Sequence, residues 1–226
     1  MIRVEVLPES GSRGRRAADL IAEAAARAVG EARRFAWAIS GGETPIPAFR
    51  RLAELDLPWH LIDTWQVDER IAPPEDPDRN SFQQRRALPP EAMDGMRWMP
   101  VEDDDLEAAA ARYAATLPDR FDVVHLGLGA DGHTASLVTG DPVLDLRDRD
   151  VAVTGPYEGL RRMTLTYPGL TRATRVVWLV TGPAKRDAVG RLVAGDRSIP
   201  ASRVPVQDQI VITDHPPGTK PHAGRT

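Results

Sequence analysis

Short apolar runs alternate along the chain with longer segments in which apolar side chains recur at helical spacing. The runs predict strands and the segments predict amphipathic helices. The predicted strands span residues 2–7, 34–39, 61–67, 97–100, 122–128, 150–154, 161–167, 175–181 and 209–213. The predicted helices span residues 14–29, 45–55, 80–88, 105–117 and 183–194. This alternation predicts an α/β fold, with a mostly parallel central sheet covered by helices on both faces.

Turn and capping residues mark the ends of several of these elements. Gly30 stands where a left-handed C-cap would end the first helix, and Asn80 is both a candidate helix N-cap and a possible ligand contact. Residues 71–79 are rich in proline and acid, which predicts a surface loop. We predict one domain over residues 1–214 and a disordered tail over residues 215–226.

Composition narrows the classes of function. The chain has 226 residues, of which 42% are hydrophobic and 27% charged, and it contains no apolar run long enough for a membrane helix and no signal-peptide pattern. We therefore expect a cytoplasmic protein without a membrane partner. It has no cysteine, so disulfides and thiolate chemistry are excluded. The net charge of −4 argues against nucleic acid as a partner, and an anionic small substrate would need local cations.

The segment HLGLGADGHTASL, residues 125–137, joins an apolar run to a glycine-rich turn. Glycine lets a ligand approach the main chain closely, and His133 in this turn brings an imidazole, a side chain suited to proton transfer. Asp131 lies two residues before it. Because α/β folds bind ligands where strands end, this turn is the first candidate for an active site. The alternative is a simple reversal of the chain with a surface histidine beside it.

A second turn, SGGET at residues 40–44, follows the apolar run FAWAI and precedes a proline. Free N–H groups and the positive end of a helix dipole favour phosphate at such a turn. Gly41, Gly42 and Thr44 are therefore candidate phosphate-binding residues, although a capped helix with nothing bound would show the same pattern. No Gly-Lys-Ser/Thr sequence follows, so this is not a Walker loop.

Charged residues near other predicted strands could complete a site. Asp68, Glu69 and Arg70 follow the third predicted strand directly, as part of a site or as a solvated rim. Arg70 could bind a phosphate through two N–H groups, and Asp68 could accept hydrogen bonds from sugar hydroxyls or orient a catalytic group. Arg162 lies in another strand-like run. Lys185 lies near a helix N-terminus, where a cation is disfavoured unless it meets an anion or its long stem reaches water.

Two kinds of catalytic site are not indicated. The five histidines are scattered, and no pair has the spacing that places two ligands on one helix face, so we predict no metal. No Gly-x-Ser-x-Gly sequence is present, which argues against a serine hydrolase with that motif.

Taken together, SGGETP, VDER, GLGADGHTASL, RRMTLT and TGPAK resemble, in order and spacing, the 6-phosphogluconolactonases over residues 36–190. The resemblance implies a Rossmann-like sheet fold shared with glucosamine-6-phosphate deaminase. It implies hydrolysis of 6-phosphogluconolactone to 6-phosphogluconate in the oxidative pentose phosphate pathway, without a redox cofactor. Glu43 departs from the family, which usually has serine or threonine there, so this carboxylate must point away from the phosphate or weaken its binding.

The resemblance also implies roles for individual residues. His133 would activate the attacking water, with Asp68 near it and Asp131 shaping the turn or orienting the imidazole. The residues around the substrate and its phosphate would be Gly41, Gly42, Arg70, Arg162 and Lys185. Two alternatives stay open at this point: a sugar-phosphate deaminase or isomerase, and a non-catalytic sugar-phosphate sensor. The chain has Arg70 where deaminases typically have tyrosine. The oligomeric state is not predicted.

Overall fold

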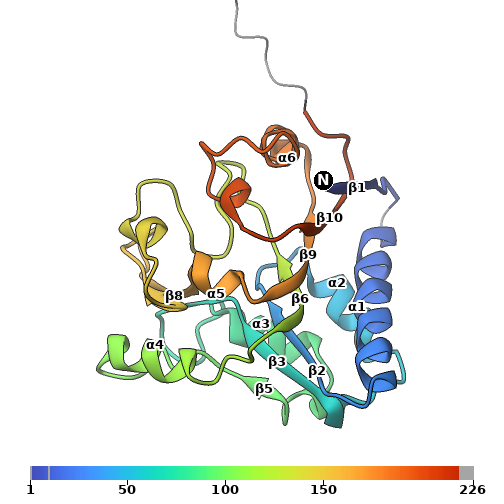
Figure 1. Ribbon diagram of the computed structural model, residues 1–226, viewed down its shortest axis with the longest axis horizontal. Coiled ribbons are helices and arrows are strands. Elements are labelled where there is room, and N and C mark those ends of the chain that lie inside the picture. Colours follow the sequence, from blue (N-terminus) through green and yellow to red (C-terminus); the bar gives the residue numbers. More distant parts are fainter. Residues whose placement is uncertain (1, 10, 219–226) are drawn as a thin grey trace, which may run out of the picture.

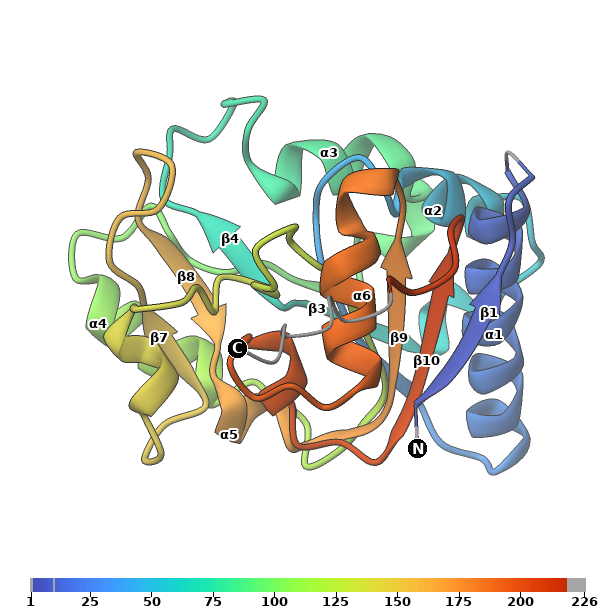
Figure 2. The ribbon, with the colours of Figure 1, turned by 90° about the horizontal axis from the view of Figure 1, so that it is seen from above.

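The computed structural model describes residues 2–9 and 11–218, and its centre is a seven-stranded sheet (Figures 1 and 2). The strand order is β1-β10-β9-β6-β2-β3-β5, and every neighbouring pair is parallel. The strands are β1 (Arg3–Val6), β2 (Phe35–Ile39), β3 (Ile62–Gln66), β5 (Met96–Arg97), β6 (Phe121–Leu126), β9 (Ala173–Val180) and β10 (Asp208–Thr213). The predicted parallel sheet is thus confirmed, and the carboxyl ends of its strands share one edge.

Helices cover both faces of this sheet, as predicted. They are α1 (Ser12–Gly30), α2 (Ile46–Ala53), α3 (Asn80–Ala87), α4 (Leu106–Ala114), α5 (Tyr167–Leu170) and α6 (Arg186–Val193). Strand β9 shows why the sheet needs a layer of helices on each face, because its buried side chains alternate between two cores. Trp178 packs in the core that includes residues of α4 and α6, whereas Val177 and Leu179 pack in the core that includes α1 and α2.

A second, antiparallel sheet lies beside the first, in the order β4-β8-β7 (Figure 2). Its strands are β4 (Asp68–Arg70), β7 (Val151–Val153) and β8 (Arg162–Leu165). The sequence predicts β7 and β8 but not β4, because three consecutive charged residues show no apolar alternation. Pairing of β4 with β8 sets Arg70 opposite Arg162 and Asp68 opposite Thr164, so this small sheet brings two predicted site segments together.

Two predicted helix ends and one predicted strand differ in the structure. Gly30 is the last residue of α1, and the left-handed residue after the helix is Ala32, with φ 57°. Asn80 is the first residue of α3, and the N-cap position is Arg79. The Asn80 side chain contacts Asp68 and Arg70 instead of capping the helix. The strand predicted at 97–100 is only the two-residue β5.

The end of the described chain packs back on α6. The Gly218 amide donates to the Arg186 carbonyl oxygen at 2.8 Å. The rest of the predicted disordered tail, residues 219–226, lies outside the described residues. Within residues 2–9 and 11–218, no helix has the length and hydropathy of a membrane span, and no group of three or more histidine, aspartate or glutamate side chains could hold a metal ion.

Candidate active site

The carboxyl edge of the parallel sheet carries a cleft in which most of the predicted site residues meet. They lie on β4, α3 and β8 and on the segments that follow β2 and β6. The cleft is lined by Ser40, Gly41, Asp68, Arg70, Asn80, Gly127, His133, Thr134, Ala135 and Arg162. Six of the ten predicted site residues are among them: Gly41, Asp68, Arg70, Asn80, His133 and Arg162.

His133 is oriented by Asp131. The Nδ1 atom lies 2.6 Å from Asp131 Oδ1, and the His133 backbone N–H donates to the same oxygen at 3.2 Å. A carboxylate at Nδ1 favours the proton there and leaves the Nε2 lone pair available. Burial raises the pKa of the Asp131 carboxyl, but the charge of His133 and its hydrogen bonds outweigh burial and hold that pKa below its ordinary value. Asp131 therefore stays an anion beside the imidazole.

Two glycines of the turn allow this arrangement. A Cβ on Gly129 would lie 2.2 Å from His133 Nδ1 and 2.4 Å from Asp131 Oδ1, so any larger residue would displace the pair. Gly132 has φ 90°, and a Cβ there would collide with Ile199. The glycine-rich sequence thus folds into a compact turn that presents the imidazole to the cleft.

Asp68 is buried, with 5% of its surface exposed. Its Oδ2 accepts a hydrogen bond from Ser136 Oγ at 2.7 Å, and its Oδ1 accepts one from Asn80 Nδ2 at 3.1 Å. Both carboxylate oxygens therefore have donors within the protein. Ser136 is not among the predicted site residues, and its only signal in the sequence is its place in the HTASL stretch.

Asn80 links Arg70 to the glycine turn. Arg70 Nη1 donates to Asn80 Oδ1 and, at 2.8 Å, to the carbonyl oxygen of Asp78. A Cβ on Gly41 would lie 1.9 Å from Asn80 Oδ1, so only glycine lets the turn after β2 approach this closely. The hydrogen bond fixes the Arg70 guanidinium at the cleft wall.

Glu69 supports the backbone of the same region, although the sequence indicates it only as a member of the charged trio 68–70. Its side chain is completely buried, and its two oxygens accept from the backbone N–H groups of Arg70, Asn80 and Ser81 at 2.7–2.8 Å. It therefore satisfies the first N–H groups of α3. The alternative of a solvated rim is wrong for Asp68 and Glu69, because the small sheet buries both.

Arg162 is also buried, and its side chain is 6% exposed. Its Nη2 lies 3.3 Å from Glu158 Oε2, and its guanidinium carbon lies 4.8 Å from the centroid of the Tyr157 ring. The Tyr157 ring in turn lies 5.3 Å from the His133 ring, in an edge-to-face arrangement. Burial raises the pKa of the Tyr157 hydroxyl, and the charges of Asp131 and Glu158 add to that effect. A neutral Tyr157 thus lies between the arginine and the imidazole.

The structure does not place three other predicted residues in this cleft. Gly42, with φ 89°, donates its N–H to Gln83 Oε1 at 3.0 Å. Thr44 lines a separate cleft together with Glu43, so the Glu43 carboxylate does not face the cleft of His133. Lys185 is half-buried in the short 3-10 helix Pro183–Lys185 after β9 and does not line the cleft. Substrate binding by Gly42, Thr44 and Lys185 stays a prediction.

His125 supports the turn after β2 and was not selected from the sequence. It is buried, and its Nδ1 accepts the Ser40 backbone N–H at 3.3 Å, while Ser40 Oγ donates to the His125 carbonyl oxygen at 3.1 Å. Burial lowers its pKa from 6.5 to about 4. His125 is therefore neutral at physiological pH and acts as a hydrogen-bond acceptor for the loop.

The fold and the site define an α/β protein in which a histidine–carboxylate pair and two arginines meet at the carboxyl edge of a parallel sheet. Residues 9–212 match the family model of "Glucosamine-6-phosphate isomerases/6-phosphogluconolactonase", and the chain belongs to this family.

Two kinds of relative share the fold. The chain is 34% identical to the 6-phosphogluconolactonase of Nostoc sp., over 92% of this chain and 93% of that protein. The crystal structure of 6-phosphogluconolactonase from Thermotoga maritima superposes with a TM-score of 0.85 at 24% identity, covering 94% of this chain and 99% of that one. A monomeric glucosamine-6-phosphate deaminase superposes with a TM-score of 0.83 at 20% identity, covering 94% and 97%. The fold alone therefore does not distinguish lactonase from deaminase.

Proposed function

We propose that the protein hydrolyses 6-phospho-D-glucono-1,5-lactone to 6-phosphogluconate, a step of the oxidative pentose phosphate pathway. The observation that carries the proposal is the His133–Asp131 pair beside a cleft lined by Arg70 and Arg162. The relative in Nostoc, named as a 6-phosphogluconolactonase and similar over nearly the full length of both chains, supports the same activity. A small sugar-phosphate lactone is then the expected partner.

His133 acts as the general base. With Nδ1 bonded to Asp131, its Nε2 takes a proton from water as the water oxygen bonds to the lactone carbonyl carbon. The carbonyl electron pair moves onto oxygen. When the tetrahedral intermediate collapses, the bond from this carbon to the ring oxygen breaks, and the ring oxygen takes the proton back from His133. General-base help of this kind contributes about 10² to 10⁴ in rate.

The arginines hold the substrate at a distance from the reacting carbon. Arg70 and Arg162 line both the cleft of His133 and an adjoining cleft that includes Gln83, Glu158 and Leu160. In the proposed complex the phosphate lies between the two guanidinium groups and the lactone ring extends toward His133, so phosphate binding orients the ring. Asp68, whose oxygens already accept two hydrogen bonds, is assigned to holding the cleft wall.

The test compares His133→Ala with the unmodified protein. The lactone is generated in situ at near-neutral pH, and the product is followed through NADPH with added 6-phosphogluconate dehydrogenase, after subtraction of the spontaneous rate. His133→Ala should lose about 10²-fold or more in kcat with little change in KM. The matched control is His60→Ala, because His60 is exposed and lies outside the cleft.

Other outcomes would select the alternatives. Lactone hydrolysis that stays above the spontaneous rate in His133→Ala would show that His133 is not the general base. If the protein does not accelerate lactone hydrolysis but releases ammonia from glucosamine 6-phosphate, it is a deaminase. Tight binding of 6-phosphogluconate without turnover of either substrate would show a sugar-phosphate sensor.

A further inference from the structure

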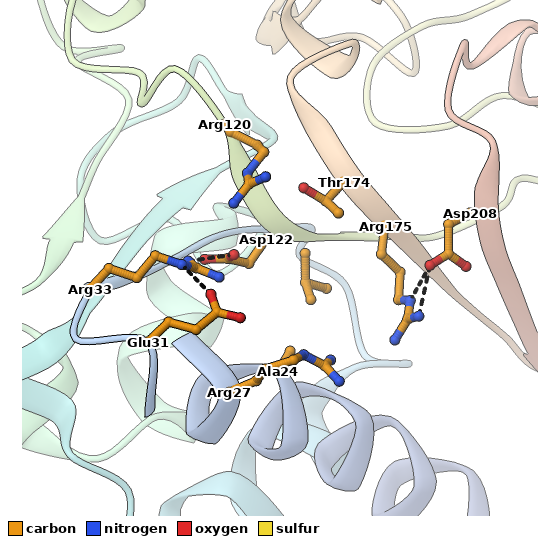
Figure 3. A pocket seen from close by; sticks show the side chains of 10 residues that line it. Ala24, Arg27, Glu31, Arg33, Arg120, Asp122, Thr174, Arg175 and Asp208 are labelled. Carbon is orange, nitrogen blue, oxygen red and sulfur yellow. Dashed lines mark hydrogen bonds and ion pairs between the residues drawn. The ribbon is translucent and has the colours of Figure 1, made fainter. Parts of the chain in front are cut away.

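A second charged cleft lies at the opposite edge of the parallel sheet, at the amino ends of its strands. It is formed by the C-terminal half of α1, by Arg33 before β2, and by the amino ends of β6, β9 and β10 (Figure 3). Its volume is about 270 Å³. Ten residues line it, among them Arg27, Arg33, Arg120 and Arg175. Four of these ten residues are arginines, in a chain whose net charge is −4.

Two of the four arginines are neutralised within the cleft. Arg33 contacts Asp122 Oδ1 at 2.7 Å and Glu31 Oε2 at 2.8 Å. Asp122 is nearly buried and also accepts the backbone N–H of Ala36 at 3.0 Å. Arg175 contacts Asp208 at 2.7 Å. All three carboxylates of the cleft are therefore occupied by these two arginines.

Among the residues that the structure describes, Arg27 and Arg120 make no ion pair or side-chain hydrogen bond. In Figure 3 they lie on opposite sides of the opening, with the Arg33 ion pairs on one flank and the Arg175–Asp208 pair on the other. The two uncompensated guanidinium groups thus border the same concave space.

We propose that this cleft binds a small phosphorylated anion, apart from the candidate active site. A guanidinium group can donate two parallel N–H bonds to phosphate, so two of them on facing walls suit a multivalent phosphate. The three carboxylates do not compete for Arg27 and Arg120, because Arg33 and Arg175 already engage them. The three carboxylates would repel the broad face of an acidic protein. A compact anion, in contrast, can contact Arg27 and Arg120 alone.

Nuclear magnetic resonance of the ¹⁵N-labelled full chain, titrated with inorganic pyrophosphate at low ionic strength, tests the site. The amide signals of residues 27, 120–123, 174 and 175 should shift and saturate. In Arg27→Gln/Arg120→Gln the apparent dissociation constant read from these signals should rise about 10-fold or more. Both arginines are exposed, so the rest of the spectrum should stay unchanged.

The control variant is Arg50→Gln, which removes an exposed arginine outside the cleft and should bind as the unmodified protein does. Shifts confined to residues 127–136 and 162 would show that pyrophosphate binds only at the candidate active site and would overturn the proposal. Shifts in the cleft that are unchanged in the double variant, or weakened equally in Arg50→Gln, would overturn it as well. Because the readout separates the two edges of the sheet, its result does not depend on the lactonase assignment.

Discussion

Two histidines separated by eight positions show how burial sets the role of one side-chain type. His133 stands at the end of the glycine turn with 24% of its side chain exposed and a carboxylate on Nδ1. His125 is enclosed, with Phe49 at its ring edge and the Ser40 amide on Nδ1. In the proposed mechanism His133 exchanges a proton with water, whereas His125 accepts the Ser40 hydrogen bond only while its Nδ1 carries no proton.

Replacement of His125 should change how stability depends on pH. The pKa of His125 is lowered to about 4 in the folded protein and is 6.5 without burial, so the unfolded chain binds more protons between these values. The free energy of unfolding should therefore fall as pH drops from about 6.5 to about 4, by about 3 kcal/mol from this residue. His125→Asn should lack this contribution.

Urea unfolding of both proteins at pH 7.5 and 5.0 measures the effect, because all other titrating groups are common to them. The difference in unfolding free energy between the two pH values should be smaller in His125→Asn. An identical difference in both proteins would contradict a buried, neutral His125.

At the level of elements, β4 and α3 both depend on the Glu69 carboxylate, which accepts hydrogen bonds from their buried backbone N–H groups. Glu69→Gln replaces one acceptor oxygen by an NH₂ group that faces backbone N–H donors, and the buried donors have no water to compensate. Stability should fall by about 2 kcal/mol or more, and KM should rise because Asn80 and Arg70 lose their support.

Thermal and urea unfolding measure the loss of stability, and initial-rate kinetics measure the change in KM. Glu102→Gln is the matched control, because Glu69 and Glu102 both contact Arg79, Glu69 at 3.7 Å. The Glu102 side chain is 55% exposed, so its loss should cost less than about 1 kcal/mol. Equal losses in the two variants would show that Glu69 does not organise the site.

The loop between β7 and β8 places the Glu158 carboxylate beside Arg162, where it competes with the phosphate of the proposed substrate. Glu158 is 70% exposed in its side chain, adopts φ 51°, and contacts Arg162 at 3.3 Å. In the proposed complex the substrate phosphate displaces the Glu158 carboxylate, at a cost typical of an exposed ion pair. Glu158→Gln should therefore lower KM about two- to fivefold with kcat unchanged. Steady-state kinetics test this against Glu54→Gln, whose arginine partner lies on α2. A higher KM in Glu158→Gln would instead mean that Glu158 positions Arg162.

These elements also show what could be predicted from the sequence. The parallel strands, the glycine turns and the strand ends that carry Asp68, Arg70 and His133 follow from local periodicity and composition. The roles of Glu69, Ser136 and Tyr157 do not, because each depends on contacts between segments far apart in the chain. Burial of Glu69, for example, requires β4 to pair with β8, and no local pattern marks three charged residues as a strand.

At the scale of the whole molecule, net charge and local charge make opposite predictions for an anionic substrate. The net charge of −4 repels it, and salt would screen that repulsion and raise kcat/KM. Arg70 and Arg162 attract it across a short distance, and salt would weaken that attraction. We expect the arginines to dominate, so kcat/KM for the phosphorylated lactone should fall severalfold between about 20 and 200 mM KCl. Arg162→Gln should flatten this slope, whereas Arg50→Gln should preserve it. A kcat/KM that rises with salt in the unmodified protein would show that repulsion by the net charge outweighs attraction by the two arginines, contrary to this prediction.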